Sequence, residues 1–313
     1  MDYKVEKIEF KSADKIHMIK GKIYIPKNKE DIKGIIQISH GMCEYIGRYT
    51  KFFEYMVKQG FVVCGHDHLG HGESVFTDEE LGFFADENGY KLLVQDLHHF
   101  TNIIKSKFVD KPIFLFGHSM GSFIVRCYLS KYGNQITGAI ICGTCGLTTV
   151  MDPAIKATEM VEKKKGKMYR SKFINDIAFG AFNLKFQPIK TRYDWVSTDE
   201  EIVKKYSEDT RCNFVFTTRA FNDLFHLISW CNSTKCFKKT PDALPLLIIS
   251  GSLDPVGEYS EGVLKVYKLF VENDCKDATL KLYSKLRHEL LNEVNYKVIY
   301  KDIQNWIENK INT

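Results

Sequence analysis

The chain has 313 residues, enough for one large domain or two smaller ones, and its 44% hydrophobic and 27% charged residues exclude a disordered or fibrous protein. A net charge of +5, from 44 basic against 39 acidic residues, is too weak to indicate a nucleic-acid-binding protein. The nine cysteines follow no disulfide framework, charges interrupt the N-terminal segment so that it has no apolar signal core, and no apolar run approaches the ~18 residues of a membrane span. We therefore expect a soluble, cytoplasmic protein with reduced thiols.

The first half of the chain alternates short apolar segments with longer amphipathic ones. Alternating polarity predicts two antiparallel strands at residues 5–10 and 16–25. Short buried strands and helices with apolar residues at helical spacing follow each other from there to residue 142. The strands are expected at residues 34–39, 61–64, 113–116 and 139–142, and the helices at residues 49–59, 89–107 and 122–132.

The second half begins with a different pattern. Residues 147–240 contain no clear buried strand and are helical, lysine-rich and aromatic. Alternation then resumes with strands at 246–250 and 279–283 and helices at 263–271 and 296–308. Strands that alternate with helices predict an α/β fold with a mostly parallel sheet covered on both faces. We expect residues 1–146 and 241–313 to form this core, with residues 147–240 inserted into it.

The strongest chemical signal is Gly117-His-Ser119-Met-Gly121. A Gly-x-Ser-x-Gly pattern is weak by itself, and an ordinary strand–turn–helix corner could contain it. Here a predicted buried strand leads into the pattern and a predicted helix follows it, which is the context of a nucleophile elbow. The sharp turn presents the serine hydroxyl at the start of a helix, whose dipole favours negative charge. We therefore predict that Ser119 is a nucleophile.

A nucleophilic serine needs a histidine base and an orienting acid, which follow it in this order of chain: serine, acid, histidine. Asp254 comes directly after the predicted strand at 246–250, and His288 lies in the loop after the strand at 279–283. Both positions belong to the carboxyl edge of a parallel sheet, where active sites gather. Glu258 and Glu289 are rival acids, and His226 lies in an apolar helical stretch. Asp254 is preferred because it follows its strand soonest.

The oxyanion of a tetrahedral intermediate requires backbone N–H donors. One is expected from Met120, directly after the nucleophile, and the other from the loop that follows the strand at 34–39. Met42 is our choice in that loop. His40, next to Gly41 at the strand end, is interpreted as a brace for the loop rather than as a base.

Five segments together resemble the monoacylglycerol lipases and lysophospholipases, a group of serine hydrolases similar to the S33 serine aminopeptidases. They occur in the family's order over nearly the whole predicted core: residues 40–49 (HGMCEYIGRY), 66–74 (HDHLGHGES), 117–121 (GHSMG), 251–254 (GSLD) and 288–293 (HELLNE). The resemblance implies an α/β-hydrolase fold, a helical cap over residues 147–240, and a catalytic triad of Ser119, Asp254 and His288. Cys43 and Tyr45 depart from the usual glycine and histidine beside the oxyanion loop, which bears on substrate preference.

Two other patterns suggest different chemistry. His66, His68 and His71 could form a metal site, but Gly70 stands where such sites have an aspartate, so we expect no metal and interpret the segment as a tight loop. Cys142-Gly-Thr-Cys145 resembles a redox motif, but no helix is predicted to begin at its first cysteine. We interpret both cysteines as reduced thiols at the end of a strand.

These patterns predict a serine hydrolase that cleaves carboxylic esters of the monoacylglycerol or lysophospholipid type through an acyl-enzyme, without a cofactor. Its partner is a small lipid or ester substrate, and the sequence leaves its oligomeric state open. The alternatives are an aminopeptidase of related fold, similar to proline iminopeptidases, and a non-catalytic binding protein. An aminopeptidase must hold a free ammonium, whereas residues 151–195 contain ten basic against five acidic residues.

Residues 171–186 carry a candidate lipid-facing surface. Their apolar residues have helical spacing and predict one shared face: Phe173, Ile174, Ile177, Ala178, Ala181 and Phe182. Either this face packs on the core and lines the acyl pocket, or part of it docks transiently on a membrane surface, where the nearby lysines meet anionic head groups.

Overall fold

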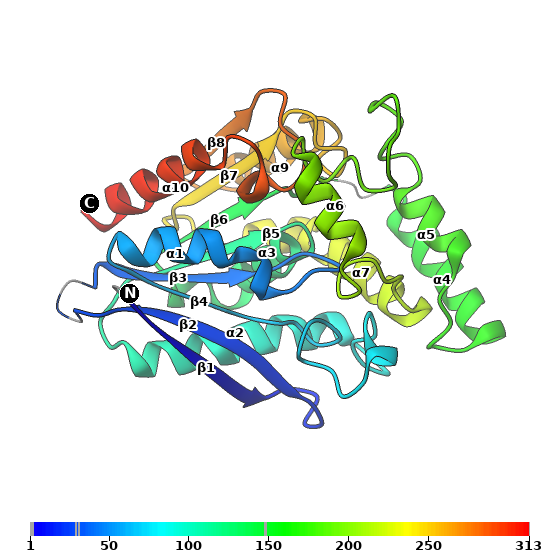
Figure 1. The fold of residues 1–313 in the computed structure, drawn as a ribbon, viewed down its shortest axis with the longest axis horizontal. Coiled ribbons are helices and arrows are strands. Elements are labelled where there is room, and N and C mark those ends of the chain that lie inside the picture. Colours follow the sequence, from blue (N-terminus) through cyan, green and yellow to red (C-terminus); the bar gives the residue numbers. More distant parts are fainter. Residues whose placement is uncertain (1–2, 29, 31, 147–148, 313) are drawn as a thin grey trace.

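An eight-stranded, mostly parallel sheet forms the centre of the molecule (Figure 1). The computed structural model describes residues 3–28, 30, 32–146 and 149–312. The strand order is β1-β2-β4-β3-β5-β6-β7-β8; β2 is antiparallel to both of its neighbours, and the other pairs are parallel. The bounds are Tyr3–Lys11 (β1), Met18–Pro26 (β2), Gly34–Ser39 (β3), Phe61–His66 (β4), Ile113–His118 (β5), Gly138–Cys142 (β6), Leu246–Gly251 (β7) and Ala278–Tyr283 (β8).

The burial of the strands follows from their place in this order. Every residue of β3, β4, β5, β6 and β7 is buried, because helices cover both faces of the central sheet. The edge strand β1 is largely exposed and alternates in polarity. The α/β class, the mostly parallel sheet and the predicted strands are confirmed, with each strand within three residues of its expected bounds.

Two sets of helices enclose the sheet. Helices α1 (Thr50–Lys58) and α10 (Tyr296–Ile311) pack on one face, where Phe52 and Ile303 join the same apolar cluster as Phe116 of β5. Helices α2 (Gly89–Lys107), α3 (Met120–Tyr132) and α9 (Glu261–Glu272) cover the opposite face in a second cluster. The sheet edge at the carboxyl ends of the parallel strands stays free for the loops that carry the predicted catalytic residues.

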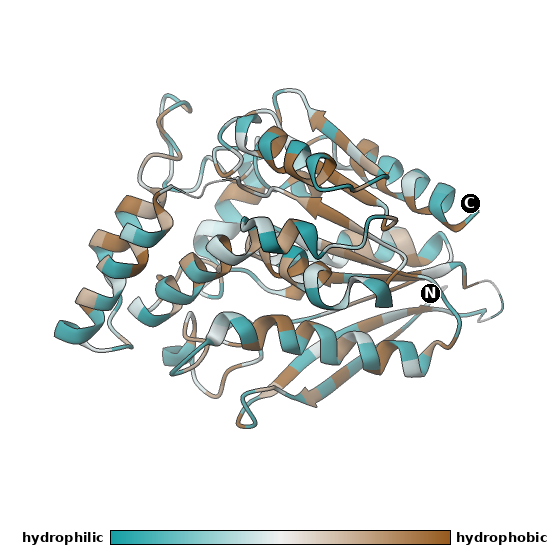
Figure 2. Ribbon diagram, turned by 180° about the vertical axis from the view of Figure 1, so that it is seen from behind, coloured by the Kyte–Doolittle hydropathy of each residue, from teal (hydrophilic) through white to brown (hydrophobic). Residues whose placement is uncertain are grey.

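Of the segment between β6 and β7, residues 143–146 and 149–245 are described; they hold five helices and no strand, which agrees with the absence of a buried strand from the sequence pattern. Residues 147 and 148, where we expect the insertion to begin, lie outside the described residues. Helix α7 packs on α2 and α3 and also carries α4, and α4 and α5 lie together at one end of the molecule (Figures 1 and 2). The bounds are Met151–Lys165 (α4), Lys172–Phe179 (α5), Glu200–Glu208 (α6), Thr218–Cys231 (α7) and Thr234–Lys238 (α8).

The apolar face predicted for residues 171–186 is divided in the structure. Helix α5 ends at Phe179, and on it Phe173 and Ile177 are 67% and 68% exposed, while Ile174 is buried. The prediction of one continuous face was wrong because the helix ends at Phe179 and the following residues form turns. Asn183 turns inward there: its amide donates to the Thr191 carbonyl at 2.8 Å and accepts from the Trp195 N–H at 2.9 Å.

Candidate active site

Ser119 sits at a strained turn between β5 and α3. Its backbone has φ 52° and ψ −122°, a conformation that costs energy for any residue with a side chain and that persists where the surrounding structure enforces it. The Ser119 N–H donates to the Cys142 carbonyl at 3.0 Å, which fastens the turn to β6. The predicted strand–turn–helix context of the elbow is therefore present.

The two glycines of the elbow are required by close backbone approaches. A Cβ on Gly121 would lie 2.0 Å from the Ser39 carbonyl oxygen, and one on Gly117 would lie 2.5 Å from the Gly121 carbonyl oxygen. Real Cβ atoms do not come so near to backbone, so helix α3 can begin tight against β3 only with glycine here. This packing brings Ser119 next to the loop that follows β3.

Asp254 and His288 meet at the same end of the sheet. His288 Nδ1 donates to the Asp254 carboxylate, with both oxygens at 2.9 Å. The carboxylate is fully buried and also accepts bonds from the Ser250 hydroxyl at 3.1 Å and the Val256 N–H at 2.9 Å. These donors fix the acid, which in turn fixes the orientation and tautomer of the imidazole.

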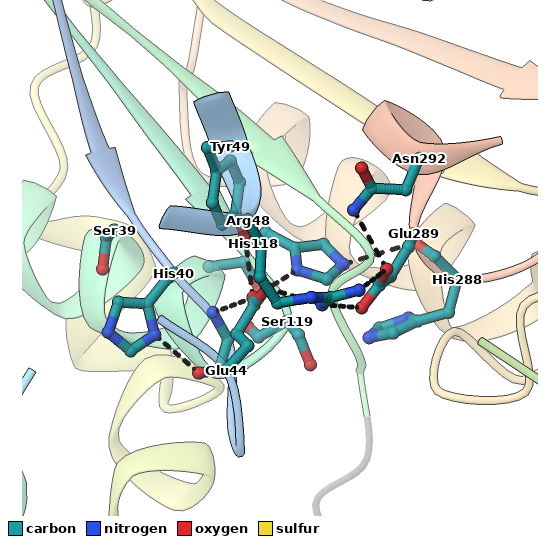
Figure 3. A network of polar contacts seen from close by, with 12 residues as sticks. Ser39, His40, Glu44, Arg48, Tyr49, His118, Ser119, His288, Glu289 and Asn292 are labelled. Atoms are coloured by element: carbon teal, nitrogen blue, oxygen red, sulfur yellow. Dashed lines mark hydrogen bonds and ion pairs between the residues drawn. The ribbon is translucent and has the colours of Figure 1, made fainter. Parts of the chain in front are cut away.

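The His288 ring lies close to the elbow. The ring of His118, the residue before Ser119, has its centroid 4.7 Å from that of His288, and Figure 3 shows Ser119 and His288 in one cluster. Within the described residues no hydrogen bond joins the Ser119 hydroxyl to His288. The structure thus links two of the three predicted catalytic side chains by a hydrogen bond and brings the third to the same end of the sheet.

The loop after β3 lies directly against Ser119. A Cβ on Gly41 would be 3.0 Å from Ser119 Cβ, so the backbone next to Met42 approaches the nucleophile closely. Met120 is the first residue of α3, where the N–H has no partner within the helix. Both N–H groups chosen as oxyanion donors therefore belong to backbone that borders Ser119.

Side chains hold this loop in place from three directions. Glu44 accepts a short bond from the Gly41 N–H, His40 Nδ1 donates to the Gly41 carbonyl at 2.8 Å, and the Cys43 N–H donates to His71 Nε2 at 3.2 Å. The interpretation of His40 as a brace agrees with this geometry. Because Cys43 has φ 52°, these bonds also support a strained residue.

The histidines around the loop are neutral because they are buried. Burial lowers the pKa of His40 and His66 to about 3 and that of His71 to about 4. Neutral His71 can accept the Cys43 N–H, and neutral His40 can accept the His68 N–H at 2.9 Å. Within the described residues, no three side chains of the metal-binding types are gathered so that they could hold an ion.

A buried network of charged side chains connects the loop to His288 (Figure 3). Glu44 accepts bonds from His118 Nδ1 at 3.0 Å and from the Tyr49 hydroxyl at 2.8 Å. Arg48 donates to Glu44 at 3.1 Å. It also forms a bidentate ion pair with Glu289 through both terminal nitrogens, one of them at 2.7 Å. The rival acid Glu289 is thus committed to Arg48 rather than to His288.

The charges in this network stabilise each other against the cost of burial. Burial alone would lower the pKa of His118 and raise that of Glu44, but their mutual hydrogen bond and attraction reverse both directions. Both His118 nitrogens face acceptors, because Nε2 also donates to the His288 carbonyl at 3.3 Å. Arg48 and Tyr49 stand in the quoted segment 40–49, yet the sequence does not reveal their partners.

The inserted segment contacts the loop that carries His288. The Glu289 N–H donates to the Val196 carbonyl at 2.8 Å, the Ser197 hydroxyl donates to the Asn292 carbonyl at 3.1 Å, and the ring of Trp195 lies 5.1 Å from that of His288. No sequence signal marks Trp195, because the contact joins residues 93 positions apart.

The other candidates lie outside this arrangement. His226 stacks on Tyr90 with ring centroids 5.3 Å apart, and Glu258 is exposed in the turn after Asp254. Cys142 and Cys145 are buried and form no disulfide within the described residues, and burial raises the pKa of Cys142. None of these groups contacts His288 through a hydrogen bond within the described part of the chain.

Comparison with known proteins places these features in a family context. Residues 30–295 match the family model described as "Serine aminopeptidase, S33". The chain is 26% identical to a monoglyceride lipase homolog of Monkeypox virus, covering 89% of this chain and 91% of that protein. It is 25% identical to a monoacylglycerol lipase of Mycolicibacterium smegmatis, covering 88% of this chain and 89% of that protein.

Solved structures agree with the fold. A thermostable carboxyl esterase from Bacillus coagulans, crystallised in complex with glycerol, superposes with a TM-score of 0.91 and 28% identity, covering 98% of this chain and 99% of that one. Among the described residues of our chain, no helix is long and apolar enough to cross a membrane.

Proposed function

The chain belongs to the S33 serine aminopeptidase family of α/β-hydrolases, and we propose that it hydrolyses carboxylic esters of the monoacylglycerol or lysophospholipid type. The observation that carries the proposal is the buried Asp254–His288 pair at 2.9 Å, set at the same sheet edge as the strained Ser119 turn. Relatives named monoglyceride or monoacylglycerol lipase, matched over most of both chains, support an ester rather than an amide substrate.

In the proposed acylation step, the Ser119 hydroxyl attacks the ester carbonyl while His288 Nε2 takes its proton. Asp254 holds His288 through Nδ1 and stabilises the imidazolium, remaining ionised itself. The negative oxygen of the tetrahedral intermediate meets the N–H groups of Met42 and Met120. His288 then protonates the leaving alcohol, and the C–O bond breaks to leave the acyl group on Ser119.

Deacylation repeats these steps with water as the nucleophile. His288 takes a proton from water, the resulting hydroxide attacks the acyl carbonyl, and the same N–H groups stabilise the oxyanion. The bond to Ser119 breaks, and His288 returns the proton to the serine oxygen. The chemistry needs only groups of this chain and water.

We also propose that residues 147–240 act as a cap that delivers lipid substrate. Support comes from the exposed apolar side chains of Phe173 and Ile177 on α5, which stands away from the sheet (Figure 2), and from three lysines, Lys163 to Lys165, in the last turn of α4. Such a surface suits transient contact with an anionic membrane, where each basic residue contributes about 1 kcal/mol.

The cytoplasmic location stays a prediction from the cysteine pattern.

A substrate panel with the purified chain tests the proposal. It contains a monoacylglycerol, a lysophospholipid, short p-nitrophenyl esters and amino-acid amides. We expect turnover of the esters and no more than trace cleavage of the amides. Amide cleavage that exceeds ester cleavage would favour the aminopeptidase alternative. Absence of any hydrolysis would favour the non-catalytic one.

A further inference from the structure

Arg48 is a largely buried cation that joins two loops far apart in sequence. It lies in the short helical turn Ile46–Tyr49, which follows the oxyanion loop, and its side chain is 11% exposed. Its guanidinium bonds Glu44, which holds the Gly41 N–H, and it also bonds Glu289, the residue after His288. One planar group therefore contacts a support of the oxyanion loop and a neighbour of the base.

We propose that Arg48 is a positioning residue that aligns the oxyanion loop with His288, an inference that rests on the proposed function. It acts on the oxyanion loop through Glu44 and on the base through Glu289. Neither carboxylate touches the reacting atoms. Their common partner fixes the distance between two loops that no covalent link holds together.

The geometry requires a guanidinium. Arg48 offers a planar fork of donors, and it uses two nitrogens on the two oxygens of Glu289 while Nη1 also reaches Glu44. Lysine carries the same charge as a single point and cannot make a bidentate pair. Burial alone would lower the pKa of Arg48, but Glu289 and Glu44 raise it, so the group stays charged.

Contacts other than the one to Arg48 also restrict Glu289. Its N–H donates to the Val196 carbonyl at 2.8 Å, and Asn292 donates to its side chain at 3.0 Å. The guanidinium of Arg48 lies 4.7 Å from the ring centroid of Tyr206 on α6. The inserted segment therefore covers the pair and keeps water from it, which strengthens the interaction.

The test compares Arg48→Lys and Arg48→Gln with the wild type. A fluorophosphonate probe labels the serine, and the labelling time course separates two quantities. Its amplitude gives the fraction of folded, competent protein, and its rate constant reports how well nucleophile and base are aligned. A steady-state assay with a short p-nitrophenyl ester gives kcat and KM. Arg219→Lys is the matched control, since Arg219 also pairs with an acid four residues away, Asp223 at 3.1 Å.

A displacement of catalytic groups by about 1 Å costs up to about 10²-fold in rate. We expect the labelling rate constant and kcat to fall about 10²-fold in Arg48→Gln and about tenfold in Arg48→Lys, with KM changed less than about threefold. Arg219→Lys should match the wild type. A lower amplitude with an unchanged rate constant would show a merely structural role and overturn the proposal.

Glu289→Gln supplies a second test that does not remove the buried cation. If Arg48 acts through Glu289, the double variant Arg48→Lys/Glu289→Gln should be hardly slower than the worse single variant. If the rate reductions of the two single variants multiply in the double variant, the two residues act independently, which would contradict the proposal. Wild-type labelling without ester turnover would refute the proposed function alone. Wild-type protein that is not labelled at all would refute both.

Discussion

The end of the sheet that carries Ser119 and the exposed pair α4 and α5 use opposite kinds of surface. Around the sheet end, Glu44 is buried, Arg48 is only 11% exposed, and the two are paired with each other and with Glu289. On α5, the large apolar side chains of Phe173 and Ile177 face outward. Each region reverses the usual rule that apolar groups lie inside and charged groups outside.

The comparison shows that the buried charges at the sheet end and the exposed apolar side chains on α5 have different physical reasons. Buried, mutually bonded charges cannot reorient, so they hold loops at fixed distances, as preorganised catalysis requires. Exposed apolar side chains gain nothing in water and are stabilised only when a partner covers them. We therefore connect the first region with chemistry and the second with substrate delivery, and perturbing each region should change a different measurement.

The largest effect is expected from the nucleophile and the base. Ser119→Ala and His288→Ala should each lower ester turnover by about 10³-fold or more, because triad members act as a unit. Ser130→Ala, in the same helix α3, and His226→Ala, the other histidine that follows the elbow, serve as controls and should retain activity. Circular dichroism checks the fold. Near-normal turnover by Ser119→Ala would show that the assignment is wrong.

The buried histidines around the loop after β3 should make the stability of the protein sensitive to acid. The pKa of His71 is lowered by burial from 6.5 to about 4, so between these values the unfolded chain binds a proton that the folded chain does not. Stability is therefore present at neutral pH and lost as the pH falls from about 6.5 toward 4.

The variant His71→Gln isolates this contribution. Between pH 7 and pH 4, the wild type should lose about 3 kcal/mol more free energy of unfolding than the variant, measured by urea titration at both pH values. Burial raises the pKa of Asp67 to about 6 and acts in the opposite direction, but it does so in both proteins. Equal losses in the two proteins would contradict the prediction.

The exposed region should respond in lipid binding rather than in chemistry. Phe173→Asp should weaken binding to phosphatidylglycerol vesicles about tenfold, through lost apolar contact and added negative charge, while turnover of a short soluble ester is unchanged. Val109→Asp is the control, since Val109 is equally exposed at 67% but follows α2 before β5, at the opposite edge of the sheet.

Salt separates two origins of vesicle binding. If lysines near α5 meet anionic head groups, the wild type should release vesicles as the salt concentration rises. A wild type that binds no vesicles at low salt would remove the proposed membrane contact. In that case Phe173 would be an exposed side chain without a lipid partner.

The smallest effect is expected from chelators and reductants. Ring nitrogens of His68 and His71 are occupied by Ser39 and Cys43, and Cys142 is buried with a raised pKa, so neither group is disposed for metal or redox chemistry. EDTA and dithiothreitol should each change ester turnover by less than about twofold. Inhibition by EDTA that zinc reverses would contradict this expectation.

Much of the fold could be predicted from the sequence because its signals are local. Apolar runs bounded by turn residues marked the strands, and helical spacing marked α2 and α10 to within three residues. The candidate site was predicted for the same reason. Ser119, Asp254 and His288 each follow a recognisable strand, and the carboxyl ends of parallel strands converge.

Only the tertiary structure decided which side chains meet across long stretches of chain. Arg48 and Glu289 are 241 residues apart, and their pairing depends on how the loops after β3 and β8 are brought together. The apolar spacing of residues 171–186 predicted one helical face, but α5 ends at Phe179 and the chain beyond it turns, with Asn183 bonded to Thr191 and Trp195, so that face is divided. Local patterns determine which elements form, since backbone bonding and periodicity are local. Burial of charge and exposure of apolar groups depend on neighbours that only the folded chain supplies.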